Sequence, residues 1–507
     1  MRNCVLAADF GTSSLKLGLF DDKCRLIHLA PGRYAYRTFS RKPGWVEQDP
    51  VEWWLAFKKA TKDTFKKSGI GKEEISCINI GAHMGLVSLD RRGNPIRPSP
   101  LFFDQRTIKQ CEKIKCSMDE KEISEICGNR VSTVQTATQI LWLKENEPKI
   151  YDRTHKFLIT PGYISYLLTD QYSYDWTHSS WSLLFNIKKK CWSKKMFDEL
   201  KISPDKFPET SISCKLLGEV TARASKETGL KAGTPVMVGG SDTPLAALAE
   251  GIVEREKALI TAGSVSSIIT CTDKPIFSNV LLNRCHIVPD RWLMQGAMNA
   301  HSNIFEWLIN ELYRSPGDEI ATKRPNIFEV VEKEIGNSPP GSNGLIFLPF
   351  LAGERSPIWD PYARGVIFGL TFHHKRGDIM RSAYEGATYA ARHNLETIES
   401  MGTTIKELKV VGGGAKSKIW NQIKADILGK RIIVEKAADA SLIGSGILAC
   451  YGAGWFSGFA KTKSVEHAKQ IFLPRLEYSK RYAEMFRIYK KLYTRIKSSF
   501  RDINRLE

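Results

Sequence analysis

The stretch VLAADFGTSS, residues 5–14, is the most informative part of this chain of 507 residues. Residues 5–8 are typical of a buried strand, and a polar turn leads from them into a second apolar strand at residues 15–20. Glycine lets a backbone approach a phosphate closely, and hydroxyl and backbone N–H groups can surround the phosphate oxygens. The pattern predicts a metal–phosphate site, although an ordinary hairpin with aspartate at its turn stays open. The candidate residues are Asp9, which would hold Mg²⁺ through water, and Thr12, Ser13 and Ser14.

A similar strand–turn–strand pattern lies at residues 258–271. Its turn is Ala262-Gly263-Ser264, between an apolar strand and a β-branched strand. Two such hairpins, one in each half of the chain, predict two loops that face one phosphate chain, with Gly263 and Ser264 as phosphate-binding residues. Hairpins favour glycine and serine at turns in any case, which leaves a purely structural alternative.

A glycine run follows a third apolar strand, at residues 408–411. The run is Gly412-Gly413-Gly414-Ala415, and Ser417 is a suitable N-cap for a helix predicted over residues 418–428. A strand, a glycine run and a helix N-terminus together bring backbone close to a nucleotide. We therefore interpret these four residues as nucleotide-binding, with an ordinary tight turn as the alternative.

A carboxylate, Asp242, lies just past a short strand at residues 236–238 and before a helix that begins near Pro244. Asp242 could serve as a plain helix N-cap, which is a common use of aspartate. It could also accept the proton of a substrate hydroxyl as a general base. We interpret it as the catalytic residue.

In this order, the four motifs resemble those of the FGGY carbohydrate kinases. Three further stretches agree with that family: PGWVEQDP at residues 43–50, LPFLAGERSP at residues 348–357, and the pattern from GVIFGL to YEG at residues 365–386. The resemblance implies two RNase H-like domains of the actin-type ATPase class around a central catalytic cleft. The sugar would lie mostly on residues 1–245 and ATP mostly on residues 246–507. It also implies that the LIGSG stretch at residues 442–446 packs beside adenosine, which makes Gly444 a candidate nucleotide-binding residue.

Length and pattern support the α/β fold class independently of that resemblance. The length fits two to four domains, and strand-like apolar runs alternate with helical patterns along the chain. Neither a Walker A sequence nor a GxGxxG motif occurs, which argues against P-loop and Rossmann folds.

The resemblance also places the sugar site, with Asp242, on five further residues: His83, Met84, Phe102, Asp104 and Arg106. Two structural alternatives are that His83 is a satisfied loop histidine and that Arg106 merely pairs with Asp104. The chain departs from xylulose kinases mainly here, with GAHMG at residues 81–85 where GQMHG is usual and Thr243 where asparagine is common. A ketopentose such as xylulose is the leading substrate. Gluconate, another sugar acid or a polyol stays open, and glycerol is disfavoured.

Two functions of other classes also stay open. One is an actin-like ATPase, and the other is a catalytically weak sugar-binding regulator. The intact Asp9, Asp242 and glycine loops argue against loss of activity.

Composition bears on partners and location. The net charge is +19 and the sequence pI about 9.3, which favours attraction of ATP and of an acidic substrate. The basic residues are scattered without a zinc, RRM or KH pattern, so we expect no nucleic-acid partner. Eleven cysteines without a disulfide framework, and no long apolar leader, favour the cytoplasm.

No apolar run reaches membrane-spanning length, so we expect no membrane association. Aromatic residues repeat at helical spacing between residues 480 and 505, which predicts a terminal amphipathic helix packed on the body. A homodimer is possible by resemblance to the family.

Overall fold

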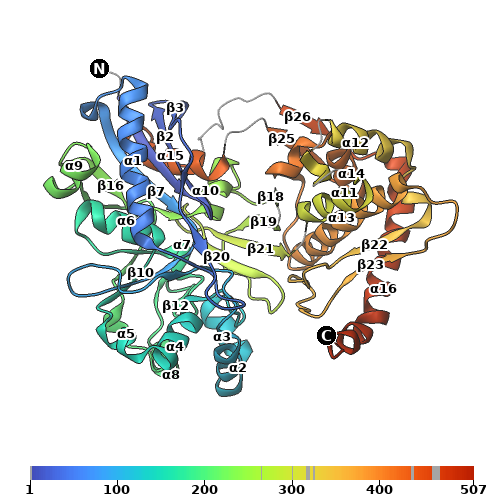
Figure 1. Cartoon of the computed structure of the whole chain (residues 1–507), viewed down its shortest axis with the longest axis horizontal. Helices are drawn as coiled ribbons and strands as arrows, with labels where there is room; N and C mark the ends of the chain where they lie inside the picture. The colour runs from blue at the N-terminus through green and yellow to red at the C-terminus, as the bar shows by residue number, and fades with distance from the viewer. Residues whose placement is uncertain are drawn as a thin grey trace.

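Two mixed β-sheets organise the two halves of the chain in this computed structural model (Figure 1). The structure describes residues 3–263, 265–299, 301–315, 320–323, 326–435, 439–459 and 469–506. Within these residues, no helix is long and apolar enough to cross a membrane.

The first sheet is built on the opening hairpin predicted from the sequence. Its strands run in the order β15-β16-β7-β1-β2-β3, with β17 also paired to β7. The strand β2 runs antiparallel to both of its neighbours, β1 and β3, whereas β7 and β16 run parallel to β1. Their bounds are β1 Cys4–Phe10, β2 Ser14–Asp21, β3 Leu26–Leu29, β7 Ile75–Ala82, β15 Leu216–Glu219, β16 Pro235–Met237 and β17 Gly240–Ser241.

Alternation along β1 explains why this sheet is covered on both faces. Successive side chains of a strand point to opposite faces. Leu6 and Ala8 pack into the core that includes Trp53 and Phe57 of α1 (Pro50–Ser68). Val5 and its neighbours on the other face pack against α10 (Asp242–Ala249) and α15 (Ala440–Gly452). The strand is therefore buried along its whole length.

The second sheet repeats the same plan. Its order is β20-β21-β19-β18-β24-β25-β26, with β18, β19 and β21 antiparallel and β24 and β25 parallel to β18. Three antiparallel strands followed by two parallel ones, in both halves, is the RNase H-like arrangement, and it confirms the predicted fold class. The bounds are β18 Lys257–Ala262, β19 Ser266–Thr272, β20 Leu282–Cys285, β21 Trp292–Met298, β24 Glu407–Val411, β25 Arg431–Glu435 and β26 Lys469–Phe472.

The remaining elements cover the sheets or extend from them. The helices are α2 Ile108–Ser117, α3 Glu120–Cys127, α4 Thr136–Asn146, α5 Pro148–Arg153, α6 Thr160–Thr169, α7 Trp176–Ser179, α8 Lys194–Glu199, α9 Ala222–Thr228, α11 Ser302–Leu312, α12 Ile327–Asn337, α13 Arg376–Ser400, α14 Lys418–Leu428 and α16 Ser479–Asn504. The short strands are β4 Tyr34–Ala35, β5 Thr38–Phe39, β6 Glu47–Gln48, β8 Leu86–Leu89, β9 Ser99–Pro100, β10 Lys156–Ile159, β11 Tyr174–Asp175, β12 Phe185–Asn186, β13 Cys191–Trp192, β14 Thr210–Ser211, β22 Ile346–Pro349 and β23 Gly365–Phe368.

The terminal helix α16 confirms its predicted amphipathic packing. Tyr482, Phe486 and Tyr489 are buried in the core of the second half, where they meet Tyr389 of α13. The basic residues between them remain on the outer side, as the helical spacing predicted.

Two helices join the halves. The helix α10 (Asp242–Ala249) follows the first sheet, and α15 (Ala440–Gly452) returns from the second sheet to contact β1, β2 and β7. Figure 1 places α15 among the strands of the first half. The predicted boundary between residues 245 and 246 falls inside α10, so that division of the chain stays a prediction.

Gly444 lies where α10 and α15 touch. A Cβ atom at this position would stand 1.9 Å from the backbone oxygen of Leu245. The prediction that Gly444 contacts adenosine therefore finds no support in its surroundings, because close packing of two helices already requires glycine here.

Replacing Gly444 by alanine is expected to lower the free energy of unfolding by about 3 kcal/mol or more, since backbone atoms cannot move aside cheaply. Urea denaturation measures this loss. Gly458→Ala is the control, because a Cβ atom there has no neighbour within 4 Å. Equal stability of the two variants would contradict the close contact.

Candidate active site

A cavity of about 1750 Å³ lies between the halves. Thr12, His83 and Asp242 line it from the first half, and Thr261 and Gly412 line it from the second. Both predicted hairpins and the predicted glycine run therefore meet at one cleft.

Asp9 is the penultimate residue of β1 and is 2% exposed, and it contacts Ser441, which lines the cleft. Its Oδ2 accepts a hydrogen bond from Ser441 Oγ at 2.6 Å, and Ser441 Oγ is also 2.7 Å from Asp439 Oδ1. One hydroxyl carries one hydrogen, so Ser441 can satisfy only one of these carboxylates at a time. Burial raises the pKa of Asp9 to about 7, and the negative charges of Asp439 and Asp242 add to the effect.

These surroundings fit a hydrated divalent cation. Asp9 Oδ1 is buried and has no hydrogen-bond partner, while Lys16 forms an ion pair with Asp439 rather than with Asp9. Across the described residues, no three His, Cys, Asp or Glu side chains converge on one point that could hold a metal. A cation near Asp9 would therefore keep much of its water shell, as Mg²⁺ usually does.

Asp242 begins α10 and is partly buried. Its Oδ1 accepts hydrogen bonds from Thr243 N at 2.6 Å, Ser241 Oγ at 3.1 Å and Thr243 Oγ1 at 3.2 Å. None of the described residues donates to Oδ2, so this oxygen is free to accept a proton from a ligand in the cleft. The hydrogen bonds on Oδ1 hold the side chain in place, and Asp242 lines the cavity.

The first hairpin turn is held from both sides. Gly11 N donates to Ser14 O at 3.2 Å, Gln48 Nε2 donates to Thr12 O at 2.6 Å, and Tyr36 Oη donates to Gly11 O. Thr12 lines the cavity, whereas Ser13 is exposed and Ser14 begins β2 without lining it.

The second hairpin turn faces the same cavity. Gly263 O accepts a hydrogen bond from Ser302 N at 3.1 Å, which ties the turn to α11, and Val265 and Ser267 line the cavity. The predicted residue Ser264 lies outside the described residues.

The glycine run packs directly against the second hairpin. Gly412 has φ +96°, and a Cβ atom there would stand 2.8 Å from Ala262 O. Gly412 and Ala415 line the cavity. Gly414 is packed under Trp420, whereas Gly413 has no neighbour within 4 Å of a Cβ position. The helix predicted over residues 418–428 is α14, and Ser417 Oγ caps it at Trp420 N.

Three of the predicted sugar-binding residues line the cavity, namely His83, Met84 and Phe102. Both ring nitrogens of His83 are buried without a hydrogen-bond partner, and burial lowers the pKa of His83 to about 4. A neutral imidazole offers one donor and one acceptor to a hydroxyl group. His83 lines the cavity, and its contact with a sugar stays a prediction.

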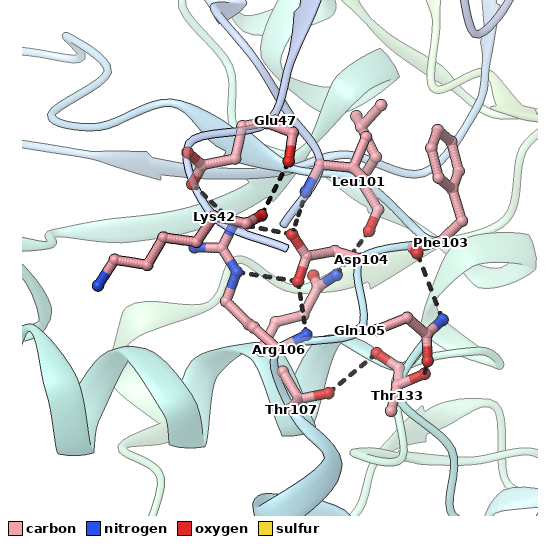
Figure 2. A network of polar contacts seen from close by, with 12 residues as sticks. Lys42, Glu47, Leu101, Phe103, Asp104, Gln105, Arg106, Thr107 and Thr133 are labelled. Carbon is pink, nitrogen blue, oxygen red and sulfur yellow. Dashed lines mark hydrogen bonds and ion pairs between the residues drawn. The ribbon is translucent and has the colours of Figure 1, made fainter. Parts of the chain in front are cut away.

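Asp104 and Arg106 do not line the cavity; they form a buried ion pair (Figure 2). Arg106 Nε and Nη2 contact the two Asp104 oxygens at 2.9 and 2.7 Å, and Nη2 also lies 3.0 Å from Glu47 Oε1. The guanidinium carbon lies 3.8 Å from the ring centroid of Trp45. Asp104 Oδ2 further accepts a hydrogen bond from Val46 N at 2.6 Å. These contacts agree with the alternative that Arg106 pairs with Asp104.

Replacing Asp104 by asparagine is expected to lower the free energy of unfolding by about 3–5 kcal/mol, because the buried Arg106 would lose its bidentate partner. Urea denaturation measures the loss, and the KM for the sugar should stay within error. Asp198→Asn is the control, since its ion pair with Lys194 is solvent-exposed. A raised KM without a loss of stability would instead support a sugar contact.

Several residues of the cavity were missed by sequence reasoning. His178 Nδ1 lies 2.7 Å from Asp175 Oδ2, and His178 Nε2 is buried without a partner. Because Asp175 also caps α7 at His178 N, the pair resembles an ordinary helix start in the sequence. Other lining residues that were missed include Arg130, Trp181, Arg284, Gln295, Asn299, Glu354, Arg355 and Trp359. Glu354 and Arg355 lie in a motif that we quoted, but nothing in the motif assigns them to the cleft.

Comparison with known families agrees with the site. The model for the N-terminal domain of the FGGY family of carbohydrate kinases matches residues 4–249, and the model for the C-terminal domain matches residues 258–453. The chain belongs to the FGGY family of carbohydrate kinases. As a member it is a sugar kinase, and the family uses ATP as phosphate donor.

Individual FGGY relatives span the whole chain. A xylulose kinase of Staphylococcus epidermidis is 28% identical over 99% of both chains, and a gluconokinase of Bacillus subtilis is 25% identical over 99% of this chain and 98% of its own. The crystal structure of xylulose kinase from Rhodospirillum rubrum superposes with a TM-score of 0.91 at 24% identity, over 98% of this chain and 100% of its own. The structural likeness shows the fold.

Proposed function

We propose that this FGGY kinase transfers the γ-phosphate of ATP to a terminal hydroxyl of a small carbohydrate, with Asp242 as general base. The observation that supports the proposal is Asp242, which lines a cleft where two hairpin turns and a glycine run meet and whose Oδ1 accepts a hydrogen bond from Thr243 N. A ketopentose such as xylulose is the leading substrate, and gluconate or another sugar acid or polyol is the alternative. Relatives named for both substrates span the chain.

In the mechanism, Oδ1 of Asp242 is held by Thr243 N, so that Oδ2 is directed at the acceptor hydroxyl and takes its proton. Phosphoryl transfer depends mainly on positioning and on stabilisation of charge. Backbone and hydroxyl groups of Thr12, Ser13, Gly263 and Ser264 would hold the β- and γ-phosphates, and the glycine run would cover adenosine. When bound at Asp9 through water, Mg²⁺ would neutralise charge on the phosphates. Closure of the halves excludes water and limits hydrolysis of ATP.

ADP release, measured with ATP and Mg²⁺ across ketopentoses, sugar acids, polyols and hexoses, tests the proposal. Stimulation by one class of acceptor, lost in Asp242→Asn, is the expected result. Release that needs no sugar and survives in Asp242→Asn would contradict it and favour an actin-like ATPase. Binding of ATP and sugar without turnover would contradict it in favour of a sugar-binding regulator.

A further inference from the structure

Three arginines line the acceptor side of the cavity: Arg130, Arg284 and Arg355. Throughout the described part of the chain, no carboxylate forms an ion pair with any of them. Buried guanidinium groups are normally paired, because an unpaired buried charge loses its hydration without compensation. The three residues therefore form a set of cations without an ion-pair partner in the part of the chain that the structure describes.

Arg284, on β20, is the deepest of the three. Its guanidinium carbon lies 4.1 Å from the ring centroid of Trp181, and Nη1 donates to Ser241 Oγ at 3.3 Å. Its Nε is buried without a partner. Burial lowers the pKa of Arg284 to about 10, with Asp242 opposing the shift and Arg355 adding to it. The side chain remains charged at neutral pH and lies beside the catalytic carboxylate.

Arg355 approaches the same region from the second half. Its Nη2 donates to Met298 O at 3.4 Å, and its Nε is buried without a partner. The adjacent Glu354 does not neutralise it: Oε1 accepts from the backbone N–H groups of Asn299 and Arg355 at 2.9 and 2.7 Å. Burial also raises the pKa of Glu354 to about 7, so its carboxyl group is partly protonated near neutral pH.

Stacking leaves the donors of these arginines available. Arg284 lies over Trp181, and the guanidinium carbon of Arg130 lies 4.4 Å from the ring centroid of Trp359. A guanidinium stacked on an indole keeps its N–H groups in its own plane, parallel to the ring. A planar oxyanion in that plane can accept two parallel hydrogen bonds. Neutral hydroxyl groups would leave the positive charge uncompensated.

We propose that Arg284 and Arg355 form an anion subsite beside Asp242 that binds the carboxylate of a sugar-acid acceptor. The subsite rests on the proposed function and selects a sugar acid among its possible substrates. The γ-phosphate of ATP has similar oxyanion chemistry. The carboxylate is favoured because Arg284 is fixed by first-half groups, Trp181 and Ser241, on the side of His83 and His178. Cys285 N also donates to Ser180 Oγ at 3.0 Å, which ties β20 to the chain just after α7.

The test uses acceptors that differ only in charge: gluconate against glucitol, and xylonate against xylitol, with xylulose alongside. The quantity is the ratio of kcat/KM for the acid to kcat/KM for its polyol. We expect the unmodified protein to prefer the acids. Arg284→Gln and Arg355→Gln should each lower the ratio about 10- to 100-fold, as expected for a lost charge-assisted hydrogen bond. The KM for ATP should change little, and any loss that is common to acid and polyol cancels in the ratio.

Arg255→Gln is the control for net charge, because the Arg255 side chain is 53% exposed and pairs with Asp273 at the surface. Equal losses on acid and polyol with a raised KM for ATP would assign Arg284 to the γ-phosphate and overturn the subsite. A preference of the unmodified protein for xylulose or the polyols would also overturn it, while leaving the proposed kinase function intact. Turnover with no acceptor would instead contradict the proposed function.

Calorimetric binding of gluconate and glucitol to the unmodified protein without ATP does not depend on any variant folding. Tighter binding of gluconate supports the subsite. Equal or weaker binding contradicts it.

Discussion

Replacing Asp242 by asparagine is expected to lower kcat for sugar phosphorylation by about 10²–10⁴-fold, the usual contribution of a positioned general base. The asparagine oxygen can still accept the hydrogen bond from Thr243 N that holds Oδ1 in the native protein. The fold and the binding of ATP should therefore survive. Steady-state kinetics and calorimetric titration with ATP measure the two quantities.

The control for Asp242→Asn is Asp290→Asn, because the Asp290 side chain is 82% exposed and makes a surface ion pair with Lys190. A loss of less than tenfold in kcat, with the variant folded and ATP bound, would contradict the assignment of Asp242 as general base.

Replacing Asp9 by asparagine is expected to abolish most activity yet stabilise the ligand-free protein above pH 7. Burial raises the pKa of Asp9 from 3.8 to about 7. Between these values the native state holds a proton that the unfolded chain has lost, so the free energy of unfolding falls as pH rises through this window. One pKa unit corresponds to about 1.4 kcal/mol, which limits the gain in Asp9→Asn at pH 8 to about 4 kcal/mol.

Urea denaturation from pH 4 to pH 8, with chelator present, measures the effect of Asp9→Asn. The unmodified protein should lose stability across this range relative to the variant, and Asp22→Asn, at an exposed position, should follow the unmodified protein. A variant that is less stable than the unmodified protein at pH 8 would show that Asp9 contributes favourable contacts that outweigh its buried charge.

Patterns within short segments of the sequence predicted several strands and helices correctly. The opening hairpin, the helix after Ser417 and the aromatic stripe of α16 each follow from strand alternation, capping or helical spacing within one short segment. The convergence of Asp9, Asp242 and the glycine run on one cleft followed from motif order and resemblance. Each of these features is encoded by residues close together in the sequence or by the order of the motifs along the chain.

Other residues could not be assigned because their partners are distant in the sequence. The Asp104–Arg106 pair is explained by Glu47, Trp45 and Val46, none of which a motif near residue 104 reveals. Gly444 is explained by Leu245 in another helix. Arg284 resembles any charged residue at a strand until the fold buries it beside Asp242 without an ion-pair partner among the described residues.

The crossing of α10 and α15 has a mechanical consequence. Asp242 begins α10, and Asp439 and Ser441, which accompany Asp9, stand at the start of α15. If one half rotated against the other about the backbone contact at Gly444, the carboxylates at the starts of these two helices would travel less than the outer walls of the cleft. Their spacing would then change least as the cleft opened and closed.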